Sequence, residues 1–489
     1  MESAHAKQHW TICPACHGQG KTLRRPSPKR WGLFKNELAK YELRGGANGN
    51  ANTGTTAPQP PLGNLDVCPN CGGSGLVAST QPIQPNPQKY PTLAIIGGGI
   101  GGVALAVACQ HRGIPYTLYE RDASFDARSQ GYGLTLQQAS KAVEALGITS
   151  LDDGVTSTRH VVHTPDGKII GEWGLRKWRK TWVQKTGRKN VHIARQTLRS
   201  LLLQEVETPE SIQWGHKLLN ISPTQTGAME LTFQAGDQQK TTHADVVVGA
   251  DGIYSMVRKL TLGEDATPLQ YLGCIVILGI CPLKSLGNIE SPLLDSATVF
   301  QTVNGHERIY MMPYDADTIM WQLSFPLSED DAQHVSAQSA GAMKEEALKR
   351  LDNWHSPVPQ ILAATLDSQI TGYPVYDRKL FDPMWLREKG NVTLLGDAAH
   401  PMSPFKGQGA NQALLDALAL ARKISVVCDS DVDWRKVGIR ESMLNEFEQE
   451  IAERSASKVQ DSRKAVDLLH SPAVLHEGDA PRGRGLNID

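Results

Sequence analysis

The chain has 489 residues, 40% hydrophobic and 21% charged, the composition of an ordinary soluble protein with two or three structural units. Its formal net charge of −1 excludes a strong overall field that would attract nucleic acid or an anionic membrane. The first thirty residues are polar and contain cysteine, and no run of about 18 apolar residues occurs, so neither a secretion signal nor a membrane span is expected.

Two near copies of one motif open the chain, CPACHGQG at residues 13–20 and CPNCGGSG at residues 68–75. Each resembles one repeat of the cysteine-rich region of J-domain co-chaperones, but no J-domain precedes them, so chaperone function is not implied. Four thiolates suffice for one closed tetrahedral Zn²⁺ site, and the candidates are Cys13, Cys16, Cys68 and Cys71. We therefore expect a zinc-binding module over residues 1–75, with a possible protein partner. A redox CxxC pair and an iron site remain the alternatives.

The other four cysteines, Cys109, Cys274, Cys281 and Cys428, lie far apart in apolar surroundings. This pattern indicates buried thiols and a reducing compartment, so we expect a cytoplasmic protein.

After a proline-rich linker at residues 76–91, the sequence from Thr92 reads TLAIIGGGIGGVALAVACQHRGIPYTLYERD. An apolar strand leads into Gly97, Gly99 and Gly102 in GxGxxG spacing, then into an alanine-rich helix and a second strand that ends at Glu120. The glycines allow a tight turn and close approach of a pyrophosphate to the helix N-terminus, and the acid can accept bonds from a ribose. The segment predicts a dinucleotide-binding unit.

Two later segments each place a carboxylate at the end of an apolar strand. ADVVVGADGIYSMVR begins at Ala244 and contains Asp251, and NVTLLGDAAHPMSPFKGQGANQALLDALALA begins at Asn391 and contains Asp397. Ligands of open α/β sheets bind at these carboxyl ends, so both aspartates are expected at one site.

In this order, the three motifs resemble those of the single-component FAD-dependent aromatic hydroxylases, which have the fold of 4-hydroxybenzoate hydroxylase. The segment PFKGQGANQALLDA is also similar to the corresponding segment of tetracycline-inactivating monooxygenases. The resemblance covers about residues 92–470. It implies FAD as cofactor, transiently bound NADPH or NADH, and O₂. It also implies insertion of one oxygen atom into an aromatic, polyene or otherwise electron-rich small molecule through a C4a-hydroperoxyflavin.

The resemblance also implies roles for individual residues. Glu120, with Arg121 beside it, matches the acid at the adenosine ribose, and Asp251 matches a residue near the pyrophosphate. Arg195 matches an arginine that contacts the flavin side of FAD, and Asp397 matches the carboxylate on the ribityl chain. Arg128 matches the arginine that precedes a small-residue turn of the family. The loop that would cradle the flavin contains Pro404, Phe405, Gly407, Gly409 and Asn411. Surface ion pairs remain open for Arg128 and Arg195, and helix capping remains open for Asp397.

No catalytic side chain is assigned, because the flavin would perform the chemistry. His400 follows GDAA and could act as a base, although packing or a loop hydrogen bond is the simpler expectation.

The expected fold class is α/β. We expect a Rossmann-like FAD-binding lobe at residues 92–264 and 381–425, with a hairpin insertion at about 155–190. A β-sheet substrate lobe at 265–380 would be interleaved with it, followed by a C-terminal helical region at 426–476 and a disordered tail at 477–489.

Strand patterns in the substrate lobe suggest pocket residues, namely Met311, Met312, Trp321 and Phe325, although a plain sheet core explains them equally well. The basic run at residues 176–189 could attract NADPH phosphates or an acidic substrate, and a solvated hairpin is the alternative.

Two other functions remain open. A flavin-dependent reductase or halogenase would share the first and third motifs. A non-enzymatic alternative is a zinc-module interaction protein with a non-catalytic flavin fold. Intact motifs favour an enzyme, but they do not identify its substrate.

Overall fold

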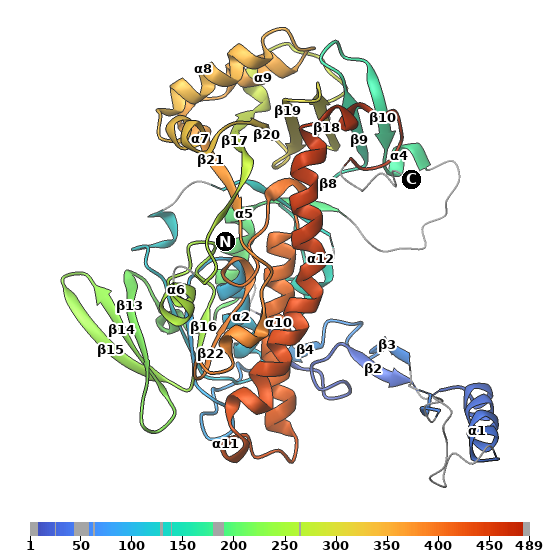
Figure 1. Cartoon of the computed structure of the whole chain (residues 1–489), viewed down its shortest axis with the longest axis vertical. Coiled ribbons are helices and arrows are strands. Elements are labelled where there is room, and N and C mark those ends of the chain that lie inside the picture. Colours follow the sequence, from blue (N-terminus) through green and yellow to red (C-terminus); the bar gives the residue numbers. More distant parts are fainter. Residues whose placement is uncertain are drawn as a thin grey trace, which may run out of the picture. The chain divides into compact units, whose positions relative to one another are not determined.

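The computed structural model of the chain describes residues 8–24, 26–43, 58–61, 64–127, 131–137, 139–178, 190–263 and 266–482 (Figure 1). The chain divides into two compact units, Met1–Gln81 and Pro82–Asp489.

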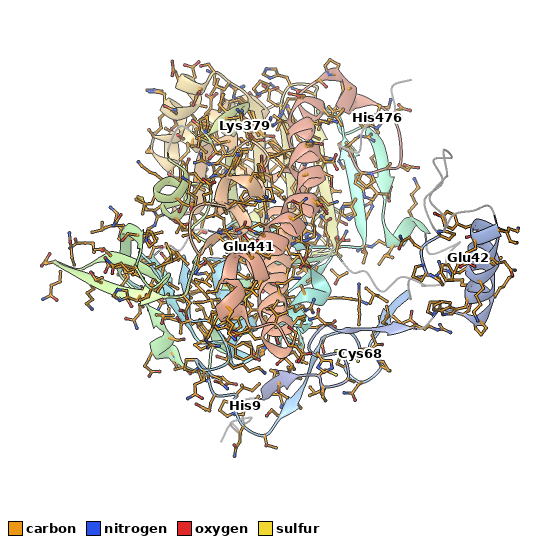
Figure 2. All side chains as sticks on the ribbon, turned by 60° about the horizontal axis from the view of Figure 1, so that its bottom comes forward. His9, Glu42, Cys68, Lys379, Glu441 and His476 are labelled. Atoms are coloured by element: carbon orange, nitrogen blue, oxygen red, sulfur yellow. The ribbon has the colours of Figure 1, made fainter. Side chains whose placement is uncertain are left out.

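The first unit is built from two short antiparallel strand pairs and one helix. Strand β1 (His9–Ile12) pairs with β4 (Leu76–Ser79), and β2 (Lys21–Arg24) pairs with β3 (Asn64–Val67). Helix α1 (Pro28–Leu43) buries none of its residues, and its side chains, Glu42 among them, project from the ribbon (Figure 2). Because β4 belongs to this unit, the boundary expected at residue 75 is too early, and residues 76–79 form a strand instead of a linker.

The second unit contains a parallel sheet with a glycine-rich turn at its centre. The strand order is β12-β6-β5-β16-β22, and all neighbours are parallel. The strands are β5 (Leu93–Ile96), β6 (Tyr116–Tyr119), β12 (Ile212–Gln213), β16 (Val246–Gly249) and β22 (Val392–Leu394). Continuous apolar runs form β5 and β16, and every residue of β5, β16 and β22 is buried, as expected for strands covered on both faces.

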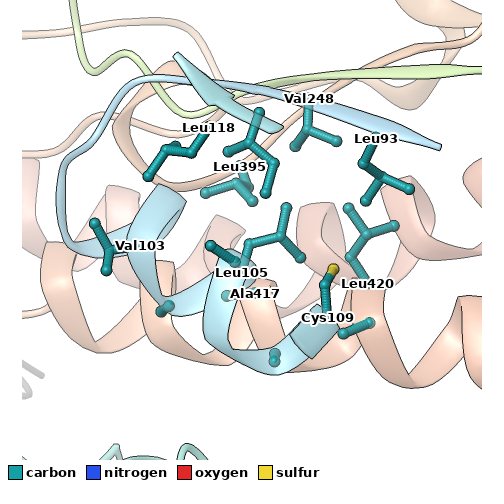
Figure 3. Close-up of a cluster of buried hydrophobic side chains, with 14 of the residues drawn as sticks. Leu93, Val103, Leu105, Cys109, Leu118, Val248, Leu395, Ala417 and Leu420 are labelled. Carbon is teal, nitrogen blue, oxygen red and sulfur yellow. The ribbon is translucent and has the colours of Figure 1, made fainter. Parts of the chain in front are cut away.

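Helices α2 (Ile100–Gln110) and α10 (Gly409–Asp429) pack against each other beside this sheet. Buried side chains such as Leu93, Leu105, Val248 and Leu420 fill the space between sheet and helices (Figure 3). Helices α3 (Ser140–Glu144), α5 (Arg195–Glu205) and α6 (Met256–Leu262) belong to the same lobe. Two smaller sheets complete it: β7-β11-β8, made of Gly133–Leu136, Val191–Ala194 and Val155–Thr156, and β13-β14-β15, made of His216–Pro223, Met229–Ala235 and Gln238–Ala244. These elements form the lobe for which FAD binding is expected.

A seven-stranded sheet in the order β10-β9-β18-β19-β20-β17-β21 forms the second lobe. Its strands are β9 (Arg159–His163), β10 (Ile169–Trp173), β17 (Gln270–Pro282), β18 (Thr298–Val303), β19 (Arg308–Pro313), β20 (Thr318–Pro326) and β21 (Ile370–Asp377). The hairpin expected as an insertion of the first lobe is thus the edge of this sheet, because β9 pairs in parallel with β18. Helix α4 (Leu175–Trp178) follows it, and the rest of the basic run, residues 179–189, lies outside the described residues.

Helices α7 (Glu329–Ser336), α8 (Ala340–Leu351) and α9 (Val358–Ala364) cover one face of this sheet. The short helix α11 (Trp434–Val437) precedes α12 (Asn445–Leu469), which runs along both lobes (Figure 1). The tail expected to be disordered is ordered as far as Arg482, because Arg482 is buried and Gly478 donates a hydrogen bond to the Ile170 carbonyl.

All eight cysteines are free thiols. Within the described parts of the chain, no helix combines the length and apolar character needed to cross a bilayer.

Candidate active site and metal centre

The glycine-rich turn between β5 and α2 is packed against backbone on two sides. Gly97 has φ +110°, and a Cβ there would lie 2.6 Å from the Ala250 carbonyl oxygen. A Cβ on Gly102 would lie 1.9 Å from the Gly97 carbonyl oxygen, so helix and turn touch directly. Gly99 is the N-cap of α2 and supplies no side-chain cap, which leaves the first N–H groups of the helix available to an anion.

Glu120 and Arg199 hold this turn from opposite sides. The Glu120 carboxylate accepts hydrogen bonds from the amides of Gly98 (2.7 Å) and Asp122 (2.9 Å). The guanidinium of Arg199 donates to the Gly98 carbonyl at 2.7 Å. Arg199 was not predicted, although its position one helical turn after Arg195 could have suggested it. Arg121 is exposed and points toward Asp122, 4.0 Å away.

The two strand-end aspartates differ in their hydrogen bonding. Asp251 caps α6, because its carboxylate accepts hydrogen bonds from the Ser255 hydroxyl and from the amides of Met256 (2.7 Å) and Val257 (3.1 Å). No described residue donates a hydrogen bond to the carboxylate of Asp397, which faces the main cavity. The structure therefore gives Asp251 a local structural role and leaves Asp397 with free acceptors.

Arg195 lies close to both Gly99 and Asp397. Its guanidinium is 3.7 Å from the position of a Cβ on Gly99, and its charge acts on Asp397. Burial raises the pKa of Asp397, while His400 and Arg195 oppose that shift. The structure thus brings together Gly99, Arg195 and Asp397. Arg128 lies outside the described residues.

Asn411 fixes the loop before α10. Its amide nitrogen donates to the carbonyls of Thr135 (2.9 Å) and Gly407 (2.8 Å), and its oxygen accepts from the amides of Gln137 and Ala139. Three of these hydrogen bonds tie the start of α10 to the end of β7 and the residues that follow it, and the fourth holds Gly407 in the loop. Gln408 caps α10 without a side-chain hydrogen bond, so this helix N-terminus is also open.

His400 belongs to a buried polar network behind Asp397. Its Nε2 lies 2.7 Å from Oδ2 of Asp416, which also accepts from the Gly396 amide. Arg454 donates to the other oxygen of Asp416 at 2.9 Å. Burial alone would raise the pKa of Asp416, but His400 and Arg454 hold it below its ordinary value. These contacts support the loop hydrogen bond expected for His400.

One cavity of about 740 Å³ joins the two lobes of the second unit. One wall is the loop that contains Pro404, Phe405, Gly407 and Gly409, with Asp397 beside it. The opposite wall is the seven-stranded sheet, which contributes aromatic and polar side chains from His160, Trp173, Arg308, Tyr310, Gln322 and Tyr373.

Of the four pocket candidates in the sheet, only Met312 lines the cavity. Met311, Trp321 and Phe325 are buried on the other face, against α8 and α9. Side chains alternate between the faces of a strand, so Met311 and Met312 must point in opposite directions. The sequence pattern contained this alternation but did not indicate which face the helices cover.

The four candidate metal ligands converge in the first unit. The Sγ atoms of Cys13, Cys16, Cys68 and Cys71 all lie within 4.8 Å of one another. The Cys13–Cys68 and Cys16–Cys71 separations are 3.9 and 3.7 Å. A tetrahedral ZnS₄ centre with Zn–S bonds of about 2.3 Å has S···S edges of about 3.8 Å, so this arrangement fits Zn²⁺.

The two motifs make equivalent, reciprocal hydrogen bonds around the thiols. The Cys13 amide donates to the Gly75 carbonyl (2.8 Å), and the Cys68 amide donates to the Gly20 carbonyl (3.0 Å). The amides of Gly20 and Gly75 each donate to a cysteine sulfur at 3.2 Å. Such N–H···S bonds stabilise thiolates, the form in which cysteine binds metal.

Comparison with known proteins identifies the second unit. A family model described as FAD binding domain matches residues 89–435. The chain is 29% identical to aurachin C monooxygenase/isomerase of Stigmatella aurantiaca, an alignment that covers 73% of this chain and 86% of the relative. It is 28% identical to the FAD-dependent urate hydroxylase of Mycolicibacterium vanbaalenii, with coverage of 78% and 89%.

Solved structures show the same fold. Klebsiella pneumoniae HpxO, complexed with FAD and uric acid, is 22% identical and has a TM-score of 0.63, with 78% of this chain and 89% of that chain covered. Tetracycline destructase Tet(55) is 19% identical and has a TM-score of 0.57, with 80% and 92% covered. The expected likeness to tetracycline-inactivating enzymes is therefore confirmed for the fold.

Proposed function

From the premise that the chain belongs to the FAD binding domain family, we infer that it is an FAD-dependent monooxygenase acting on aromatic small molecules. In the net reaction, NAD(P)H supplies two electrons. One oxygen atom of O₂ converts a C–H bond of the substrate to C–OH, and the other atom leaves as water. Bound FAD supplies the redox chemistry, since it accepts the hydride and activates O₂.

The observation that carries this proposal is a cavity with the Asp397 loop on one wall and an aromatic sheet face on the other. The free acceptors of Asp397 fit a hydroxyl-bearing chain such as the ribityl group of FAD. The uncapped N-termini of α2 and α10 fit a pyrophosphate and an electron-rich ring edge, respectively.

Within this site, the protein positions the reactants and excludes water. Glu120 and Arg199 fix the glycine-rich turn, and Asn411 fixes the loop before α10. Tyr310, Tyr373 and Trp173 provide an aromatic surface for a planar substrate. We propose NADPH or NADH as a co-substrate that binds without a domain of its own.

A direct assay tests the assignment. The purified full-length chain should carry FAD, and aromatic compounds from a broad phenolic panel should stimulate NADPH or NADH oxidation with little release of H₂O₂. Asp397→Ala should lower FAD occupancy at least about tenfold, because it removes the free strand-end acceptors. Asp461→Ala, which changes another carboxylate in the cavity wall, is the matched control.

A chain purified without flavin would contradict the proposal. Bound FAD without substrate-stimulated oxidation would favour the reductase alternative.

We also propose that Cys13, Cys16, Cys68 and Cys71 hold one structural Zn²⁺ ion, on the basis of the tetrahedral sulfur spacing. No open coordination position is needed for a structural site. Elemental analysis of the purified chain should give one zinc per chain.

A further inference from the structure

Arg308 is a buried cation in the wall of the main cavity. It is the first residue of β19, and its side chain lies on the cavity face of the sheet with Tyr310 and Met312. Only 4% of its surface is exposed to solvent. The structure therefore places a positive charge in the cavity wall, beside the rings of Tyr310 and Phe405.

The hydrogen-bonding capacity of Arg308 is mostly unused. Its Nε donates to Oε1 of Gln301 at 2.8 Å. Its Nη1 is buried and has no hydrogen-bond partner in the described part of the chain. The guanidinium lies 4.9 Å from the ring centre of Tyr310 and 5.7 Å from that of Phe405. These neighbours are neutral, and ring contacts do not replace the missing acceptor.

No described carboxylate pairs with Arg308. Glu307, the preceding residue, is held by Arg350 at 3.1 Å and by Asn304 at 2.6 Å. His470 contacts Phe405, and burial, with Arg308 contributing, lowers the pKa of this histidine to about 4, so it is neutral at physiological pH. Burial lowers the pKa of Arg308 to about 10, which still leaves it charged.

A buried guanidinium without a counter-ion is costly to the fold. Arginine offers parallel N–H donors in a fork that matches planar oxyanions. An anionic oxygen that enters the cavity would meet these donors and would also neutralise the charge. The counter-ion of Arg308 would therefore come from a ligand bound in the cavity.

We propose that Arg308 binds an ionised oxygen of the substrate, so that the enzyme selects aromatic anions over neutral aromatic compounds of the same shape. The proposal rests on the monooxygenase function and names the substrate class of that same site. Tyr310 and Phe405, which flank the guanidinium, would contact the ring that bears the anion.

Paired probes test this selection on the FAD-loaded enzyme. The probes are salicylate and 2-naphthoate, each compared with its carboxamide, and binding is followed by the change in flavin absorbance. The wild-type enzyme should bind at least one acid about tenfold or more tightly than its amide. Arg308→Gln should weaken acid binding by about 10- to 100-fold and amide binding by less than about threefold. Arg308→Lys should retain part of the selectivity.

Lys458→Gln is the matched control, because it removes another positive charge from the cavity wall and leaves the buried arginine intact. We expect less than about a threefold change in acid binding. An equal loss in this variant would show that the overall charge of the cavity, and not Arg308, selects the anion, which overturns the proposal.

Two other results would also overturn it. One is equal binding of acids and amides, or no binding of either acid, by wild-type enzyme that carries FAD. The other is loss of FAD in both Arg308 variants, which would assign the arginine to the cofactor or the fold. If the wild-type chain carries no FAD, the proposed function fails instead. If neither variant folds, the comparison of acid and amide in the wild type still decides.

Discussion

Gly99 and Gly102 occupy the same turn but are glycines for different reasons. At Gly102 a Cβ would lie 1.9 Å from backbone, and neither α2 nor the turn can move without separating helix from strand. At Gly99 the backbone has φ −74°, which any residue adopts, and the nearest atom to a Cβ is the flexible end of Arg195 at 3.7 Å. Gly102 is therefore required by packing, whereas Gly99 leaves room for a ligand.

We expect Gly102→Ala to lower the free energy of unfolding by about 2–4 kcal/mol, because the new methyl group overlaps the Gly97 carbonyl. Gly99→Ala, the matched control, should change stability by less than about 1 kcal/mol and should act mainly on FAD affinity. Urea unfolding and flavin occupancy of both variants measure the two effects. Equal destabilisation by the two substitutions would contradict this account.

At the scale of elements, one face of the seven-stranded sheet packs against helices and the other face lines the cavity. On β19, Ile309 and Met311 pack against helices, while Arg308, Tyr310 and Met312 face the cavity. Two strands of the second unit, β9 in this sheet and β11 in the smaller sheet β7-β11-β8, bury histidines in neutral form. Burial lowers the pKa of His163 on β9 to about 4 and that of His192 on β11 to about 3. Both are almost fully enclosed, and each has a ring nitrogen without a partner among the described residues.

These histidines predict acid sensitivity of the fold. Their folded-state pKa values lie below the unfolded value of about 6.5, so the unfolded chain binds more protons. The stability that depends on these histidines being neutral is fully present above about pH 6.5. It is lost as the pH falls toward 4. Each should remove about 2 kcal/mol of stability by pH 5.

Urea unfolding between pH 7.5 and 5 measures this effect. His163→Phe should reduce the loss by about 2 kcal/mol, because the variant removes one titrating group from the core. His243→Gln changes an exposed histidine on β15 and should leave the pH dependence unchanged. A variant of His163 with the wild-type pH profile would disprove the assignment.

At the scale of the whole molecule, the chain consists of two units with different sources of stability. The second unit has large apolar clusters in both of its lobes. In the first unit, the one cluster of buried apolar residues in the described part consists of cysteines with Val77 packed against them. We propose that metal binding at the four thiols supplies the folding free energy that so small a core does not provide.

We therefore expect a strong zinc chelator to unfold residues 1–81 and to leave FAD bound to the second unit. Protease cleavage within residues 1–81 and the flavin absorbance measure the two events. Cys13→Ser should reproduce the effect of the chelator without any addition, while Cys428→Ser, a thiol in the second unit, should not. Release of FAD on chelation would show that the two units fold together.

Elements whose chemistry is local could be predicted from the amino-acid sequence. Glycine spacing, apolar runs and strand-end carboxylates predicted the parallel sheet, the helix after the turn and the FAD family, because each signal is contained in a short segment. The paired CxxC motifs likewise predicted which four thiols would meet.

The long-range partners of each residue became visible in the folded structure. It moved residues 76–79 into the first unit and residues 159–173 into the substrate sheet, since strand pairing joins segments far apart in the chain. It also separated Asp251, whose acceptors are occupied by α6, from Asp397, whose acceptors are free. Arg308 became a candidate for substrate binding because three-dimensional packing buried it without an acidic partner among the described residues, and no local pattern encodes the absence of a partner.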